Sequence, residues 1–260
     1  MKLGVSCPPE YWQLLKEIGY DYAEGYFAGV TLADEAAFRI LCEKRTHAGL
    51  NVEVLNGFFT GNAVLYGTDR KKTEADIAEY AEKGFFRAKT LGASVAVIGS
   101  GKARSIPADM AKEEAEDRFV SILSLLGDLA KQYDIQLAVE PLSHKETNLI
   151  GTVAEGNRFA VMSKRENVGT MIDFFHAFAN GDPLDSLKIA KGKLFHAHIA
   201  RPALDRKVPT QNDRASCEKF AIALKNIGYD ERISLEAIFG EDMEKDLREA
   251  YAVMQLFRNH

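Results

Sequence analysis

The sequence predicts a (β/α)8 barrel. Short apolar segments alternate with longer amphipathic segments eight times along the 260 residues. Strict alternation of strands and helices indicates parallel strands, and eight such units in about 250 residues are typical of this barrel. A doubly wound sheet is the alternative fold, but no Gly-x-Gly-x-x-Gly motif follows the first strand, so a dinucleotide site has no support.

The predicted strands are short apolar runs that end at residues unable to continue a sheet. Pro8 and Pro9 follow the first strand, Gly99 follows the fourth and Pro141 follows the fifth. Proline has no backbone donor for a sheet ladder, so Glu140 should be the last residue of the fifth strand. The predicted strands cover residues 3–6, 20–24, 52–55, 94–98, 135–140, 168–172, 194–199 and 233–235.

The predicted helices show apolar residues at helical spacing, and the first two end at Gly19 and Gly49. A loop rich in glycine and aromatic residues covers residues 56–67. The predicted helices cover residues 11–18, 32–48, 71–91, 112–133, 154–162, 184–190, 213–227 and 243–257. Because no linker rich in Pro, Gly or Ser interrupts this pattern, we expect one domain over residues 1–260.

The composition restricts the partners and the compartment. A net charge of −5 argues against a surface for nucleic acid or anionic membranes, because phosphate binding needs clustered Lys and Arg. Cys7, Cys42 and Cys217 are too far apart for a zinc knuckle and odd in number, which does not fit a disulfide framework. Residues 1–6 carry no export signal, and no apolar run reaches the length of about 18 residues that spans a bilayer. We therefore expect a cytoplasmic protein.

Four successive strands end in side chains that can bind a metal ion. In a barrel the carboxyl ends of the strands carry the active site, so these residues should meet there. Each has a simpler explanation alone: a solvated carboxylate, a helix N-cap or a buried core histidine. They are Glu140, Asp173, His198 and Glu236. Three carboxylates and one imidazole suit one divalent ion, with Mn²⁺ preferred and Mg²⁺ or Co²⁺ as alternatives, since hard oxygen ligands dominate.

Several motifs resemble those of the ketose 3-epimerases (D-tagatose and D-psicose 3-epimerases), which belong to the xylose-isomerase-like sugar isomerase and epimerase superfamily. The motifs are Glu140-Pro141-Leu142 with Glu146, Asp173-x-x-His176, His196-x-His198, Arg206-Lys207-Val208-Pro209 and Ser234-Leu235-Glu236. The resemblance implies that Glu140, Asp173, His198 and Glu236 bind one divalent metal. It also implies that Glu146, His176 and Arg206 contact a sugar substrate, and members of the family are often homo-oligomers.

Two positions depart from the family pattern. Arg206 follows His198 by two residues more than expected, so Arg201 is an alternative for its role. The fourth-strand loop, residues 99–104, lacks a Trp-Pro pair, and its Lys102 and Arg104 could contact an anionic substrate or simply face solvent.

The placement of the two glutamates predicts the chemistry. Proton removal next to a carbonyl gives an enediolate that a divalent metal stabilises as a Lewis acid. Glu140 and Glu236, from the fifth and eighth strands, can flank the substrate and act as an acid–base pair that inverts the carbon. We expect His196, one pleat deeper, to support the metal ligands. Aromatic residues on the strand-end loops could exclude water, with core packing as the alternative: Tyr26, Phe27, Phe58, Phe59, Phe174 and Phe175.

The predicted function is therefore a metal-dependent epimerase of a ketose or related keto-polyol. The alternatives are an aldose–ketose isomerase resembling hydroxypyruvate isomerase and an inosose-type dehydratase. An apurinic endonuclease would need histidines where the third and fourth strands end at Asn56 and Ser100, together with a basic groove. A barrel that binds sugar without catalysis is the last alternative.

Overall fold

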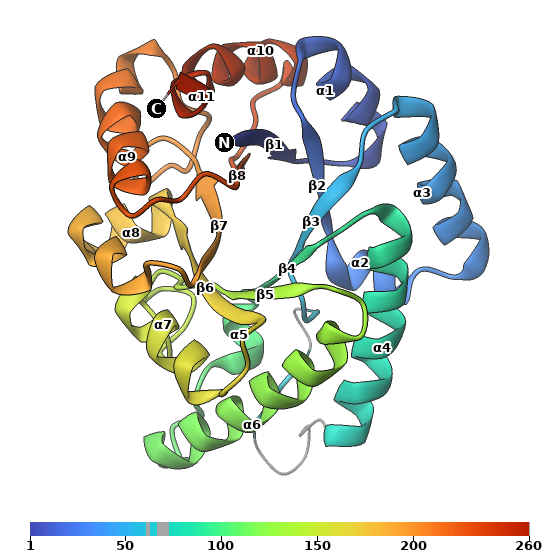
Figure 1. Ribbon diagram of the computed structural model, residues 1–260, viewed down its shortest axis with the longest axis vertical. Helices are drawn as coiled ribbons and strands as arrows, with labels where there is room; N and C mark the ends of the chain where they lie inside the picture. The colour runs from blue at the N-terminus through green and yellow to red at the C-terminus, as the bar shows by residue number, and fades with distance from the viewer. Residues whose placement is uncertain (61–62, 67–72, 260) are drawn as a thin grey trace.

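A closed barrel of eight parallel strands forms the centre of the molecule, in the order β1-β2-β3-β4-β5-β6-β7-β8 (Figure 1). The computed structural model describes residues 1–60, 63–66 and 73–259. The closure of β8 on β1 confirms the predicted (β/α)8 barrel and excludes the open doubly wound sheet. The helices form an outer ring around the strands (Figure 1).

The strands lie where the sequence predicts them, with small shifts at their ends. Their bounds are β1 Lys2–Ser6, β2 Tyr22–Tyr26, β3 Val52–Asn56, β4 Val95–Ile98, β5 Gln136–Val139, β6 Val168–Asp173, β7 Leu194–Ile199 and β8 Arg232–Leu235. The prediction was wrong at the start of β2, because the Tyr20 N–H bonds back to the carbonyl of Leu15 at the end of the preceding helix. The Asp21 carboxylate accepts the N–H of Leu3, and the strand begins only at Tyr22.

The helices include short elements that the sequence pattern did not indicate. The α-helices are α1 Trp12–Ile18, α2 Phe27–Leu32, α3 Glu35–Ala48, α4 Glu74–Leu91, α5 Gly101–Arg104, α6 Lys112–Lys131, α7 Val153–Met162, α8 Phe174–Asn180, α9 Arg214–Asn226, α10 Met243–Met254 and α11 Leu256–Asn259. The 3-10 helices are η1 Pro9–Tyr11, η2 Leu184–Ala190 and η3 Gln211–Asp213. Residues 71–72, the predicted start of the helix between the third and fourth strands, and residues 61–62 and 67 of the predicted loop lie outside the described residues.

Three helix predictions need correction. The helix predicted over 32–48 begins at Glu35, because the Asp34 side chain accepts the N–H of Ala37 and caps a new helix there. The segment 184–190 is a 3-10 helix rather than an α-helix, with the Ser186 N–H bonded to the carbonyl of Pro183. The helix predicted over 243–257 is divided at Gln255.

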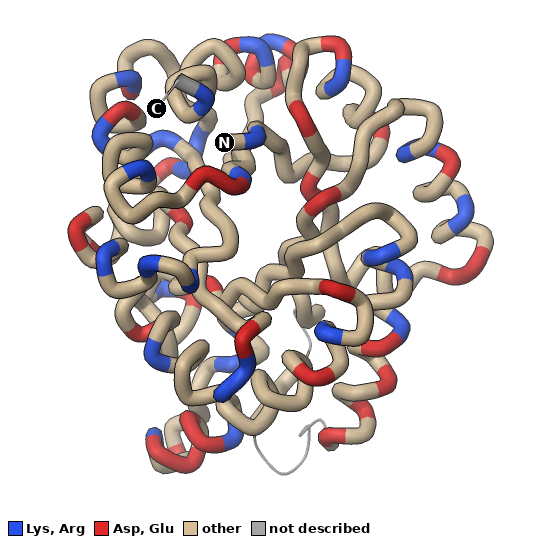
Figure 2. Tube along the Cα trace, in the orientation of Figure 1, with Lys and Arg blue, Asp and Glu red and all other residues tan. Residues whose placement is uncertain are grey.

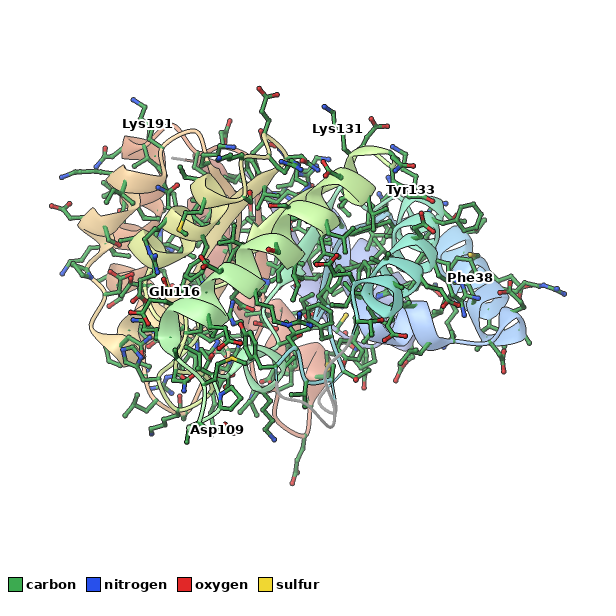
Figure 3. The ribbon with its side chains drawn as sticks, turned by 90° about the horizontal axis from the view of Figure 1, so that it is seen from below. Phe38, Asp109, Glu116, Lys131, Tyr133 and Lys191 are labelled. Atoms are coloured by element: carbon green, nitrogen blue, oxygen red, sulfur yellow. The ribbon has the colours of Figure 1, made fainter. Side chains whose placement is uncertain are left out.

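Two hydrophobic layers stabilise the barrel. The inner layer fills the barrel with side chains from alternating strand positions: Tyr22, Val54, Val95, Val97, Ala138 and Met171. The outer layer lies between strands and helices, where long helices such as α6 bury an apolar face (Figure 3 shows α6 between Glu116 and Lys131). Among the described residues no helix is both long and apolar enough to cross a membrane.

An ion cluster closes the amino-terminal end of the barrel. The Glu53 carboxylate accepts hydrogen bonds from Lys2 Nζ at 2.7 Å and from Arg232 Nε at 2.7 Å. Elsewhere acidic and basic residues are interspersed along the outer helices in the view of Figure 2. The opposite end, where the strands finish, carries the candidate site.

Candidate functional site

The four predicted metal ligands lie together at the carboxyl ends of β5, β6, β7 and β8. One ligand atom from each of Glu140, Asp173, His198 and Glu236 lies within 4.8 Å of every other. His198 Nδ1 lies 3.0 Å from Glu236 Oε2, 3.5 Å from Glu140 Oε1 and 3.9 Å from Asp173 Oδ2. The imidazole nitrogen is therefore surrounded by three carboxylates.

The sheet positions the two glutamates that flank this nitrogen. Glu140 lies one residue beyond β5 rather than inside it, but its N–H still bonds to the Ile98 carbonyl at 3.2 Å. Likewise Glu236 follows β8, and its N–H bonds to the Ile199 carbonyl at 3.0 Å. Gly99 makes room for the first carboxylate, since a Cβ at Gly99 would lie 2.1 Å from Glu140 Oε2.

Asp173 has two roles, one for each carboxylate oxygen. Oδ1 accepts the N–H groups of Phe175 at 2.8 Å and His176 at 3.3 Å and so caps α8. Oδ2 faces the site and accepts a hydrogen bond from Arg206 at 2.9 Å. The helix-cap and functional interpretations of this residue are thus compatible.

Glu24 is a buried member of the site that the sequence analysis missed. It extends from β2, is fully buried and bonds two imidazoles: His198 Nε2 at 2.8 Å and His196 Nε2 at 3.0 Å. Because its contact occupies Nε2 of His198, Nδ1 is left facing the carboxylates. The signal was present, since Glu24 lies in a predicted strand at a spacing of two from the inward Tyr22.

His196 supports the site through Glu24, which it shares with His198.

Asn56 at the end of β3 is a second residue whose role was missed. Its side-chain amide donates to Glu236 Oε1 at 2.9 Å and to Ser6 Oγ at 3.0 Å. Asn56 thereby orients the second oxygen of Glu236.

The three predicted sugar contacts line the same cavity: Glu146, His176 and Arg206. His176 Nδ1 accepts the N–H of Ser143 at 3.1 Å, which leaves the ring proton on Nε2. Glu146 is the more exposed partner, with Oε1 at 3.6 Å from His176 Nδ1.

The structure distinguishes the two arginines that compete for the third role. Arg206 donates to both Asp173 and Glu236, and its guanidinium lies 5.0 Å from the ring centre of Phe175. Arg201 lies instead near Asp205 and Asp213 and does not line the cavity. The role of Arg206 as a substrate contact stays a prediction, but its position in the cavity favours it over Arg201.

Arg104 on the fourth-strand loop is a buried structural cation. Its guanidinium donates to the carbonyl of Ile98 at 3.2 Å and to the carbonyl of Glu140. It is only 1% exposed, so it neither faces solvent nor remains free for an anionic substrate. Arg104 instead ties the end of β4 to the residue that follows β5.

The six aromatic residues of the strand-end loops differ in how deeply they are buried. Four pack in the core: Phe27, Phe58, Phe59 and Phe174. Phe27 stacks on Phe58 with ring centres 4.1 Å apart, as the core-packing alternative predicts. Tyr26 is half-exposed and lines the cavity.

The electrostatics of the site are dominated by buried negative charge. Burial and the neighbouring Glu236 raise the pKa of Glu140. Burial also acts to raise the pKa of Glu236, but His198 and Arg206 outweigh it and lower this pKa to about 2. Burial acts to lower the pKa of His198, but Glu24 and Glu236 outweigh it and raise this pKa well above 6.5.

These residues fit a divalent cation. His198 Nδ1 is buried and makes no well-aligned hydrogen bond within the described residues, although Glu236 Oε2 lies 3.0 Å away. The four carboxylates Glu24, Glu140, Asp173 and Glu236 outnumber the two cationic groups beside them, Arg206 and His198, and such an excess of buried negative charge is costly without a cation. The donor set of oxygens and one nitrogen suits Mg²⁺, Mn²⁺ or Zn²⁺ in general.

A closed parallel barrel with side chains able to bind a metal ion gathered at its strand ends is typical of barrel enzymes. The chain belongs to the xylose isomerase-like TIM barrel family, whose model matches residues 12–257. This confirms the family-level resemblance found in the sequence motifs.

Named relatives are isomerases and epimerases. Inosose isomerase of Bacillus velezensis is 27% identical over 243 residues, which cover 86% of this chain and 81% of that protein. Inosose isomerase of Bacillus subtilis (strain 168) is 31% identical over 134 residues, 48% of each chain, so the match spans about half of that relative. D-psicose 3-epimerase of Agrobacterium fabrum is 30% identical over 133 residues, which cover 51% of this chain and 44% of that protein.

Solved structures share the fold at low identity. D-psicose 3-epimerase in the presence of D-fructose superposes with a TM-score of 0.83 and 19% identity, covering 100% of this chain and 99% of that chain. The IOLI protein with a bound zinc atom gives a TM-score of 0.75 and 22% identity over 100% of this chain and 99% of that chain. These neighbours establish the barrel architecture over the full length of the chain.

Proposed function

We propose that this protein is a divalent-metal-dependent epimerase of a ketose or related keto-polyol, acting at the carbon next to the carbonyl. The observation that carries the proposal is the pair Glu140 and Glu236, which approach His198 Nδ1 from β5 and β8. Inversion of a carbon requires one group to remove a proton from one face and another to return it from the other face. Two carboxylates from separate strands meet that requirement.

Other residues of the chain bind and orient the substrate or hold the metal ion. His176, Glu146 and Arg206 line the cavity and orient the hydroxyl groups of the sugar. A divalent cation held by Glu140, Asp173, His198 and Glu236 would act as a Lewis acid toward the substrate carbonyl and its neighbouring hydroxyl. We propose Mn²⁺ as the physiological ion, because three of the four ligands are carboxylates.

Hydrogen exchange in D₂O tests the reaction directly. The protein, freed of metal by a chelator and reloaded with Mn²⁺, is incubated with a panel of ketoses and ketose phosphates. We expect deuterium at C3 of the recovered ketose and its C3 epimer, and loss of both when chelator is present. Deuterium at C1 or C2 would instead indicate an aldose–ketose isomerase.

The variant Glu140→Gln separates an enzyme from a passive binder. It removes a proton-transfer group and a charged ligand while keeping the side-chain size, so exchange should fall to background. A protein that only binds sugar would show no exchange in either form. Absence of exchange with every sugar tested would contradict the proposed function.

A cyclic keto-polyol is a second candidate substrate, favoured by the inosose isomerase that matches 86% of this chain. An inosose carries a carbonyl flanked by carbinol carbons, so the same acid–base pair can act on it. Exchange with an inosose but not with open-chain ketoses would favour this candidate, and loss of water would indicate a dehydratase.

A further inference from the structure

A single cavity of about 870 Å³ extends from the candidate metal site past the ends of β2 and β3 toward α3. Its polar groups gather at the metal end, whereas the far end is apolar. We call the far end the apolar arm, which is defined by Trp12, Val30, Ala37, Ile40, Leu41 and Leu55. Figure 1 shows α3 at the outer edge of the molecule, beside β3.

Helix α3 presents an apolar face to this cavity. Ala37, Ile40 and Leu41 follow the i, i+3, i+4 spacing of one helix face, and all three line the arm. In a barrel such a face ordinarily packs against the strands. Here Ile40 is 51% exposed, and the buried residues of this 14-residue helix are Phe38 and Ala48.

Contacts outside the arm hold α3 in place. The ring of Phe38 packs under the guanidinium of Arg87 on α4, at 4.6 Å (Figure 3 labels Phe38 at the edge of the molecule). Arg87 also forms an ion pair with Glu35 at the start of α3. The position of α3 therefore does not depend on filling the arm with side chains.

The size and the polarity of the cavity indicate its ligand. Sites of 300–1,000 Å³ hold drug-sized ligands and combine mostly apolar walls with a few placed polar groups. A free hexose is smaller than such a ligand and has hydroxyl groups on every side, so it would leave the arm to water against apolar walls. Because the arm and the metal end form one cavity, one molecule can fill both.

We propose that the substrate is a keto sugar that bears an apolar substituent of about aryl size, with its carbonyl at the metal end and its substituent in the apolar arm. The inference rests on the proposed function for the carbonyl end only. The substituent end would contact the α3 side chains that retain accessible surface, Ala37, Ile40 and Leu41.

Calorimetric binding to the metal-loaded protein tests the arm without requiring turnover. The probes are 6-O-methyl-D-fructose and 6-O-benzyl-D-fructose, which both lack the pyranose form and differ only in the size of the apolar group. We expect the benzyl ether to bind at least about tenfold more tightly, because burying an aromatic ring removes a large apolar surface from water. In D₂O exchange the same preference should appear mainly as a lower KM.

Two variants of adjacent alanines on α3 test the location. Ala37→Phe fills the arm from an exposed position of the helix, so the two sugars should then bind with similar affinity. Ala36→Phe makes the same change at a neighbouring exposed alanine that does not line the cavity, and the tenfold preference should remain. Both positions are exposed, so neither variant disturbs the core.

The outcomes separate the two proposals. Equal affinities for both sugars in the unmodified protein, or equal losses in the two alanine variants, would overturn the apolar arm. Tight binding of the benzyl ether that Ala37→Phe abolishes, without exchange on either sugar, would support the arm and contradict the epimerase.

Discussion

Replacement of Glu24 by Gln should weaken metal binding although Glu24 is not a predicted ligand. The carboxylate bonds His198 Nε2 at 2.8 Å and His196 Nε2 at 3.0 Å, and both contacts are fully buried. Glutamine keeps the size of the side chain, but its amide offers one acceptor oxygen where the carboxylate offers two. One imidazole must then change its protonated nitrogen or face an N–H donor.

The expected loss follows from the buried contact. A buried polar group left without its partner costs about 1–3 kcal/mol. Removing the partner of a metal-binding histidine typically lowers metal affinity about 10–100-fold, which corresponds to about 1.4–2.7 kcal/mol. The two ranges agree, so we expect the Kd for Mn²⁺ to rise about 10–100-fold in Glu24→Gln.

Titration calorimetry with Mn²⁺ measures this change, and Glu53→Gln provides a matched control. Glu53 is a buried carboxylate that also bonds two side chains, but it lies at the opposite end of the barrel. The control should lower the free energy of unfolding and leave the Kd for Mn²⁺ unchanged. An unchanged Kd in Glu24→Gln, or the same change in both variants, would refute the reasoning.

Three further predictions concern the supports of the site and the barrel. Gly99→Ala should lower kcat about 10²-fold with little change in Tm, because the new Cβ would lie 2.1 Å from Glu140 Oε2 and displace it; wild-type kcat would contradict the close approach. Arg104→Met should lower the free energy of unfolding in urea by about 1–3 kcal/mol, since the buried carbonyl of Glu140 loses its side-chain donor and that of Ile98 keeps only the N–H of Glu140; an unchanged denaturation midpoint would count against this. Burial acts to raise the pKa of Glu53, but the bonded Lys2 and Arg232 outweigh it and lower this pKa. The stabilisation from ionised Glu53 is therefore present above the unfolded-state pKa of about 4.3 and is lost as the pH falls through the folded-state pKa. Denaturation of Glu53→Gln between pH 7 and pH 2 should therefore show a weaker acid dependence, and an identical slope would refute it.

The sequence was informative where a residue's role follows from its position in a strand. Glu140, Asp173, His198 and Glu236 follow the rule that strand ends meet, and the structure brings them within one small volume. The prediction was less accurate at turns. At Asp34, for example, a side-chain cap starts a helix later than the apolar spacing suggests.

Roles that depend on contacts across the barrel could not be derived from local patterns. A glutamate on β2 is compatible with solvent, core or site, and only barrel closure shows that Glu24 meets two histidines of β7. Arg104 is a similar case, since its burial depends on carbonyl groups from two different strand ends. The apolar arm likewise depends on the distance between α3 and the strands, which the spacing of apolar residues in the sequence does not predict.

The bond between Glu24 and His198 also bears on how the protein folds. The two residues are 174 positions apart, so their contact forms only after the amino-terminal and carboxy-terminal halves have come together. Contacts of such long sequence separation carry a large loop-closure cost and tend to form late and slowly. The imidazole of His198 is therefore oriented only in the closed barrel, and an intermediate with β7 and β8 detached would lack the orientation that the proposed metal binding requires. Metal uptake during refolding would then report the final step of chain assembly rather than the formation of individual strand–helix units.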